Sequence, residues 1–329
     1  MRKKMSRLLT TVSTITFLAA SSVPADVPKV VTDIAPVHSL VSRVMDGIGA
    51  PDLIVPNEAS PHDYRLRPAD AEAIENAKLV FWMGEGLTPW MERALNALGN
   101  DANVVELLAL NETEVLPFRE GALFEAHDHD DHDDHDDHDH DKEHDDHDDH
   151  DDHAGHDHGE FDPHAWLSTN NAKTWLNVIA AKLSSLDPEN AGTYFANANE
   201  ARSEIDALND EVNKMLNPVR GGKFIVFHDA YQYFEAVYDF PASGAISLSD
   251  ASDPSAARIA EIAARIKNEN IKCVLSEPQF NAGLVKTVMG GTEAITQVID
   301  PVGFGIEPGS SLYPQLIRNM AKSLVDCLK

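Results

Sequence analysis

Positive charge is scarce in this sequence. The 329 residues include 26 Lys and Arg against 55 Asp and Glu, a formal net charge of −29 at pH 7 with His neutral. Because nucleic acid and anionic membrane surfaces repel such a chain, neither is expected as a partner. The length allows two domains, each with its own hydrophobic core.

Long apolar runs are also missing. The N-terminus has a basic head, MRKKMSR, then the short apolar run LLTTVSTITFLAA, then small residues in SVPADV. An apolar run of about 13 residues is shorter than the ~20 that span a bilayer, which disfavours a membrane anchor. The pattern predicts a signal peptide over residues 1–25, cleaved after Ala25, and an exported soluble protein.

Cysteine occurs only twice, as Cys273 and Cys327. Two cysteines without a CxxC pattern do not indicate a zinc ribbon. In an oxidising compartment an isolated pair favours a disulfide, which would tie the C-terminal segment to a strand. Two buried free thiols are the alternative.

Histidine and acidic residues, in contrast, are concentrated in one segment. Residues 120–160 hold twenty Asp and Glu against Lys142 alone, a local net charge of −19. With no large apolar side chain to bury between residues 127 and 158, this segment is predicted to be a disordered loop on a folded body. Twelve of the 16 histidines lie in it: His127, His129, His132, His135, His138, His140, His144, His147, His150, His153, His156 and His158.

This histidine-rich tract attracts cations through its charge and its many imidazoles. Each complex must order flexible chain, so we expect several weak sites rather than one tight site. Protonation of imidazole near pH 6.5 should weaken them as the medium acidifies. A solubilising acidic loop is the alternative, although acid alone does not require a histidine at every third position.

Outside the tract, short apolar runs rich in β-branched residues alternate with helical patterns. This alternation predicts α/β architecture, with two lobes of parallel four-stranded sheet and flanking helices. The expected strands are KVVTDI, DLIV, LVFWMG and NVVEL in the first lobe, and KFIVF, SGAISL, IKCVLS and AITQVI in the second.

One long helix is predicted between the lobes, over residues 187–216. Asp187 suits an N-cap and Pro188 the first helical position. One apolar stripe runs along it at steps of four and three residues, which favours a rigid connecting strut over a coiled coil. The stripe consists of Tyr194, Ala198, Ala201, Ile205, Leu208, Val212 and Met215.

Three of the four remaining histidines follow predicted strands or precede a helix. His228 directly follows KFIVF, His62 follows DLIV by a short loop, and His164 stands in FDPHAWLS before a helix. Ligand groups in open α/β sheets lie beyond the carboxyl ends of the strands, where Asp300 and Glu277 are also expected. Three imidazoles and one oxygen donor suit tetrahedral Zn²⁺. His38 falls within a helical pattern and is interpreted as structural.

Five motifs resemble, in order and spacing, those of the zinc-specific substrate-binding proteins of ABC importers, the ZnuA-like cluster of metal-binding receptors. They are NEASPHDYRLRPAD, FDPHAWLS, FHDAYQYF, SEPQF and IDPVG. The resemblance covers essentially the whole mature chain. It implies a signal peptide over 1–25, a first lobe over 26–186 that contains the tract, a connecting helix over 187–216 and a second lobe over 217–329.

Carried over residue by residue, the resemblance makes His62, His164 and His228 the imidazole ligands. Some relatives have Glu just before the first ligand, but here Pro61 stands there and offers no side-chain donor. Asp300 or a water then completes the site, and Glu277 supports it from outside. The resemblance implies a monomeric periplasmic receptor that captures Zn²⁺ and hands it to a membrane permease with a cytoplasmic ATPase.

Two other functions are compatible with a zinc site. A three-histidine zinc with an open position also activates water in hydrolases, but HExxH, GxSxG and a general base placed by spacing are all missing. We therefore expect no enzymatic activity. A periplasmic zinc buffer or metallochaperone, in which the tract does the main work, is the other alternative.

Overall fold

The computed structural model describes residues 27–99, 101–119, 123–124, 161–247, 254–279 and 282–329. The predicted signal peptide and the tract histidines, from His127 to His158, lie outside these residues. Among the described residues, no helix is long and apolar enough to cross a membrane.

The first lobe is built on a parallel sheet in the order β2-β1-β3-β4. β1 and β3 are buried along their whole length, as expected for central strands covered on both faces. Its strands are β1 (Val30–Thr32), β2 (Asp52–Leu53), β3 (Leu79–Trp82) and β4 (Asn103–Glu106), and its helices are α1 (Ala35–Val44), α2 (Pro68–Asn76), α3 (Pro89–Leu98) and α4 (Thr169–Leu186).

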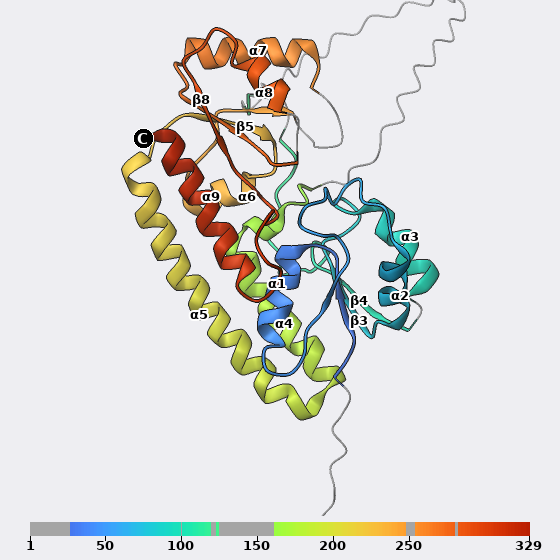
Figure 1. Cartoon of the computed structure of the whole chain (residues 1–329). Helices are drawn as coiled ribbons and strands as arrows, with labels where there is room; N and C mark the ends of the chain where they lie inside the picture. Colours follow the sequence, from blue (N-terminus) through green and yellow to red (C-terminus); the bar gives the residue numbers. More distant parts are fainter. Residues whose placement is uncertain (1–26, 100, 120–122, 125–160, 248–253, 280–281) are drawn as a thin grey trace, which may run out of the picture.

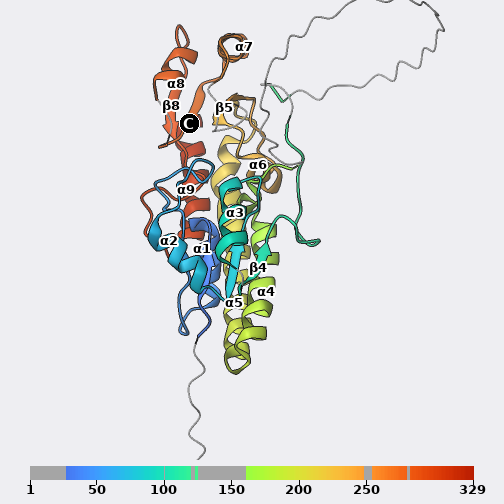
Figure 2. The same cartoon turned by 90° about the vertical axis from the view of Figure 1, so that its right-hand side faces the viewer.

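The second lobe repeats this topology, with the strand order β6-β5-β7-β8. In Figures 1 and 2 it lies above the first lobe. Its strands are β5 (Phe224–His228), β6 (Ala245–Ser247), β7 (Cys273–Ser276) and β8 (Ile295–Val298), and its helices are α6 (Gln232–Tyr238), α7 (Ala256–Asn268), α8 (Ala282–Val288) and α9 (Leu312–Leu328). The predicted fold class, two parallel four-stranded lobes joined by a long helix, is confirmed. The residue boundaries of the predicted domains stay a prediction.

The connecting helix is α5 (Ala191–Leu216), 26 residues and about 39 Å long. It begins later than predicted, because a 3-10 turn over Pro188–Asn190 precedes it. Asp187 still stabilises this start, since its Oδ2 accepts from Asn190 Nδ2 at 2.7 Å and from the Tyr194 hydroxyl at 2.9 Å.

The apolar stripe of α5 faces the interior as predicted, except that Leu216 is buried where Met215 is only half-buried. The helix packs against α1 and α4 of the first lobe and α9 of the second. It therefore runs along both lobes (Figure 1).

A disulfide joins Cys273 in β7 to Cys327 in α9, with the two Cα atoms 5.5 Å apart. Both cysteines are buried. The predicted disulfide is thus present and ties the C-terminal helix to a central strand of the second sheet.

Candidate metal site

A small cavity of about 20 Å³ lies at the carboxyl ends of the strands, between the lobes. Such a volume is close to that of one water molecule or ion. All three predicted histidine ligands line it, together with residues of the loops after β2, β7 and β8. The lining residues are Ser60, Pro61, His62, His164, Trp166, His228, Glu277, Gln279, Pro301 and Val302.

His164 stands at the turn before α4 and is 6% exposed. Asp162 holds it in two ways: Oδ1 accepts from the His164 backbone N–H at 2.9 Å and lies 2.7 Å from the ring Nδ1. The downstream chain is anchored by Ser168, whose hydroxyl caps α4 by accepting from Asn171 N at 3.2 Å. These contacts direct His164 Nε2 away from Asp162 and into the cavity.

His228 is the last residue of β5 and is 4% exposed. Its Nδ1 lies 2.7 Å from Glu277 Oε1, in the loop after the adjacent strand β7. Glu277 is also buried, at 4% exposed. The supporting role predicted for Glu277 matches this contact, although its part in metal binding stays a prediction.

The two rings face each other through Nε2 atoms 3.5 Å apart. A carboxylate beside each Nδ1 favours the tautomer that carries the proton there, and this tautomer leaves the Nε2 lone pair to coordinate a cation. Tetrahedral zinc with Zn–N bonds of about 2.0–2.1 Å places two ligand nitrogens about 3.4 Å apart. The separation of the two Nε2 atoms therefore matches that of two nitrogen ligands of one tetrahedral zinc.

His62 lies in the loop after β2, with its ring centroid 5.9 Å from that of His164. Trp90 steadies this loop by donating Nε1–H to the Pro61 carbonyl at 2.8 Å. Within the described ranges, no three His, Cys, Asp or Glu side chains already surround a common metal position. The ring centroids of His164 and His228 are 5.3 Å apart, so the three rings lie close together around the cavity, and we expect small side-chain shifts to bring them onto one metal ion.

Asp300 follows β8 and lies close to the site without being one of the cavity-lining residues. Its Oδ1 accepts from Val302 N at 3.0 Å. Burial raises the pKa of Asp300, the backbone amides of residues 302–304 oppose this rise, and the charge of Glu277 adds to it. Its assignment as the fourth ligand stays a prediction.

His38, interpreted as structural, lies in α1 with Nε2 3.2 Å from the Pro51 carbonyl oxygen. Burial lowers its pKa, against the opposing effects of that carbonyl and of Asp52.

The contacts that Asp162 and Trp166 make with His164 were not predicted from the sequence. The D-x-H spacing of Asp162 and His164 was a usable signal for an oriented ligand. Trp166 packs its ring 5.2 Å from that of His164 and donates Nε1–H to the Pro301 carbonyl of the second lobe at 2.7 Å. No local pattern points to that contact, because 135 positions separate the two residues.

Asp162 and Glu277 contact the Nδ1 atoms of His164 and His228. We expect Asp162→Asn and Glu277→Gln each to weaken Zn²⁺ binding about 10–100-fold, because the partner that fixes the ring and raises its basicity is lost. Competition titration against a chelator measures this effect. Glu204→Gln, which alters a surface carboxylate paired with Arg43, is the control. Equal affinities in all three variants would contradict the assignment.

Comparison with known proteins gives matches over almost the whole chain. Residues 30–327 match the family described as the periplasmic component A of the zinc-uptake complex. The high-affinity zinc uptake system protein ZnuA of Brucella abortus (strain 2308) is 50% identical over 313 residues, covering 94% of each chain.

Two solved structures share the fold. A crystal structure of ZnuA has a TM-score of 0.71 at 21% identity and covers 92% of this chain and 100% of that one. The SBP FpvC from Pseudomonas aeruginosa, in complex with Mn²⁺, has a TM-score of 0.72 at 20% identity and covers 92% and 98%. The fold alone therefore does not identify the metal that a chain binds.

Proposed function

This chain belongs to the ZnuA family of periplasmic zinc-uptake components, and we propose that it holds one Zn²⁺ ion between its lobes with His62, His164 and His228. As a member of that family it is a zinc-binding receptor for import, and the role we propose includes no catalytic step. The observation that carries the ligand assignment is the pair of inward-facing Nε2 atoms at 3.5 Å.

The donor set favours zinc over manganese. Neutral imidazoles suit Zn²⁺, whereas Mn²⁺ prefers carboxylate, carbonyl and water oxygens. Asp162 and Glu277 each face an Nδ1, so these carboxylates support the rings. Asp300 or a water supplies the fourth ligand. Copper(II) and nickel(II) also bind such a set, and metal supply then selects zinc.

Delivery requires partners and a location. The chain is exported to the periplasm after cleavage behind Ala25, acts as a monomer, and docks on a membrane permease driven by a cytoplasmic ATPase. The tract from His127 to His158 provides additional weaker zinc sites near the cavity. The described segments before and after the tract meet next to His164, since Asp162 N donates to the Leu116 carbonyl at 2.8 Å. This contact supports the proposed location.

Zinc titration of the mature chain and of a variant lacking residues 127–158 tests this function. We expect one tight site in both proteins, and further weak sites that disappear with the deletion and weaken below about pH 6.5. Loss of the tight site in the deletion variant would instead support a buffer or metallochaperone that relies on the tract.

A further inference from the structure

The segment that leads from β4 toward the tract crosses onto the second lobe. Leu116 N donates to the Tyr233 hydroxyl oxygen at 2.9 Å, and Gln232 Nε2 donates to the Pro117 carbonyl at 2.9 Å. Gln232 and Tyr233 both belong to α6 of the second lobe. Arg119 adds the next contact along this segment.

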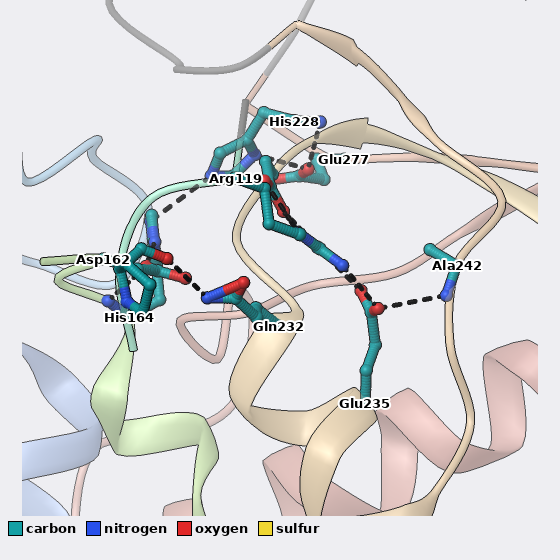
Figure 3. Close-up of polar contacts among 10 residues, drawn as sticks. Arg119, Asp162, His164, His228, Gln232, Glu235, Ala242 and Glu277 are labelled. Carbon is teal, nitrogen blue, oxygen red and sulfur yellow. Dashed lines mark hydrogen bonds and ion pairs between the residues drawn. The ribbon is translucent and has the colours of Figure 1, made fainter. Parts of the chain in front are cut away.

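The Arg119 guanidinium bridges two carboxylates of the second lobe. Its Nε lies 3.0 Å from Asp229 Oδ2, and its Nη1 and Nη2 donate to Glu235 at 2.7 and 3.0 Å. Figure 3 shows Arg119 pointing toward Glu235, which also accepts from Ala242 N at 3.0 Å. Asp229 and Glu235 are 7% and 6% exposed.

Two buried negative charges so close together need a partner that serves both. The planar arginine fork presents several donors in one plane, so one guanidinium can satisfy two carboxylates, whereas a lysine ammonium acts as a point charge. Breaking such a buried pair leaves uncompensated charge. Arg119 therefore holds its own segment firmly against the end of β5 and against α6.

Tyr233 makes a second connection at the same place. Its hydroxyl accepts from Leu116 N and donates to the Asp162 carbonyl at 2.8 Å, while Asp162 N donates to the Leu116 carbonyl. The backbone of Asp162, whose carboxylate orients His164, is thereby tied to α6. We call the contacts of residues 116–119 and Asp162 with Asp229, Gln232, Tyr233 and Glu235 the cross-lobe clamp.

Both ends of the clamp adjoin a proposed metal ligand. Asp229 directly follows His228, and Asp162 precedes His164 by two residues. The two imidazoles come from different lobes, yet their Nε2 atoms are 3.5 Å apart. A site preorganised in this way loses less entropy on binding, and affinity differences of this kind arise mostly in the dissociation rate.

We propose that Arg119 and Tyr233 are positioning residues that hold His164 and His228 together across the lobes and so set the rate of zinc release. This inference rests on the proposed zinc site. Neither Arg119 nor Tyr233 lines the cavity. The role proposed for them is therefore distinct from that of the metal ligands.

Stopped-flow transfer of zinc to a chelator tests the proposal on the mature full chain. In Arg119→Gln and Tyr233→Phe we expect zinc release about tenfold faster, with an association rate close to that of the unaltered protein. Arg119→Lys keeps the positive charge but loses the planar guanidinium. Its rate of zinc release should therefore lie between that of Arg119→Gln and that of the unaltered protein. Tyr233→Phe removes one hydroxyl and decides the outcome if Arg119→Gln does not fold.

Arg43→Gln is the matched control, because Arg43 also bridges two carboxylates, Glu200 and Glu204, on α5. It should leave zinc release unchanged even if the zinc-free protein becomes less stable. Release at the unaltered rate in both clamp variants, or the same acceleration in Arg43→Gln, would overturn the proposal. Absence of tight zinc binding in the unaltered protein would instead refute the proposed function.

Discussion

Replacing His164 or His228 by alanine is expected to weaken zinc binding by several hundred-fold. Structural zinc sites contribute about 10–16 kcal/mol over four ligands, so one ligand corresponds to roughly 2.5–4 kcal/mol, or about 10²–10³ in affinity. These two residues form a pair with Nε2 atoms 3.5 Å apart. Loss of either one breaks this pair.

Competition titration with a zinc chelator measures this loss, and thermal unfolding of the zinc-free variants checks that each remains folded. His38→Ala is the control, since His38 is also buried but bonds to the Pro51 carbonyl in the first lobe. It is expected to reduce stability while zinc affinity stays unchanged. An equal loss of affinity in all three variants would show that the effect comes from general unfolding rather than from lost ligands.

Reduction of the Cys273–Cys327 disulfide is expected to lower the free energy of unfolding by about 4 kcal/mol. The bond closes a loop with a sequence separation of 54 residues, and opening a loop of that size returns this much conformational entropy to the unfolded chain. Urea unfolding of the zinc-free protein with and without dithiothreitol measures the difference.

The double variant Cys273→Ser with Cys327→Ser provides the control for this measurement. It should unfold at a lower urea concentration than the oxidised protein and should not respond to dithiothreitol. An unfolding midpoint that dithiothreitol leaves unchanged in the unaltered protein would contradict the prediction.

The fold was largely predictable because its signals are local. Runs such as KFIVF and LVFWMG are apolar and β-branched or aromatic, which indicates central strands buried on both faces, and β5 and β3 are such strands. The start of α5 was misplaced by a few residues. A favourable cap at Asp187 does not by itself distinguish a 3-10 turn from the first α-helical turn.

The candidate site was predictable only in part. His164 and His228 were identified by their places beside strands and helix starts, and Asp162 stands two positions from His164. Glu277 reaches His228 across 49 positions, and Arg119 reaches Asp229 across 110. Such pairings depend on how separate strands and lobes pack, which no local periodicity reports.

The sequence by itself determined the alternation of strands and helices, the presence of one long connecting helix and the chemical type of the candidate metal donors, because each is expressed in residue type and spacing along the chain. Only the tertiary structure decided that two imidazoles meet through their Nε2 atoms, that His62 lines the same cavity, and that the cross-lobe clamp lies behind the pair. The reason is physical: each ring is oriented by a carboxylate of its own lobe, and the two rings meet only when both lobes are packed along α5.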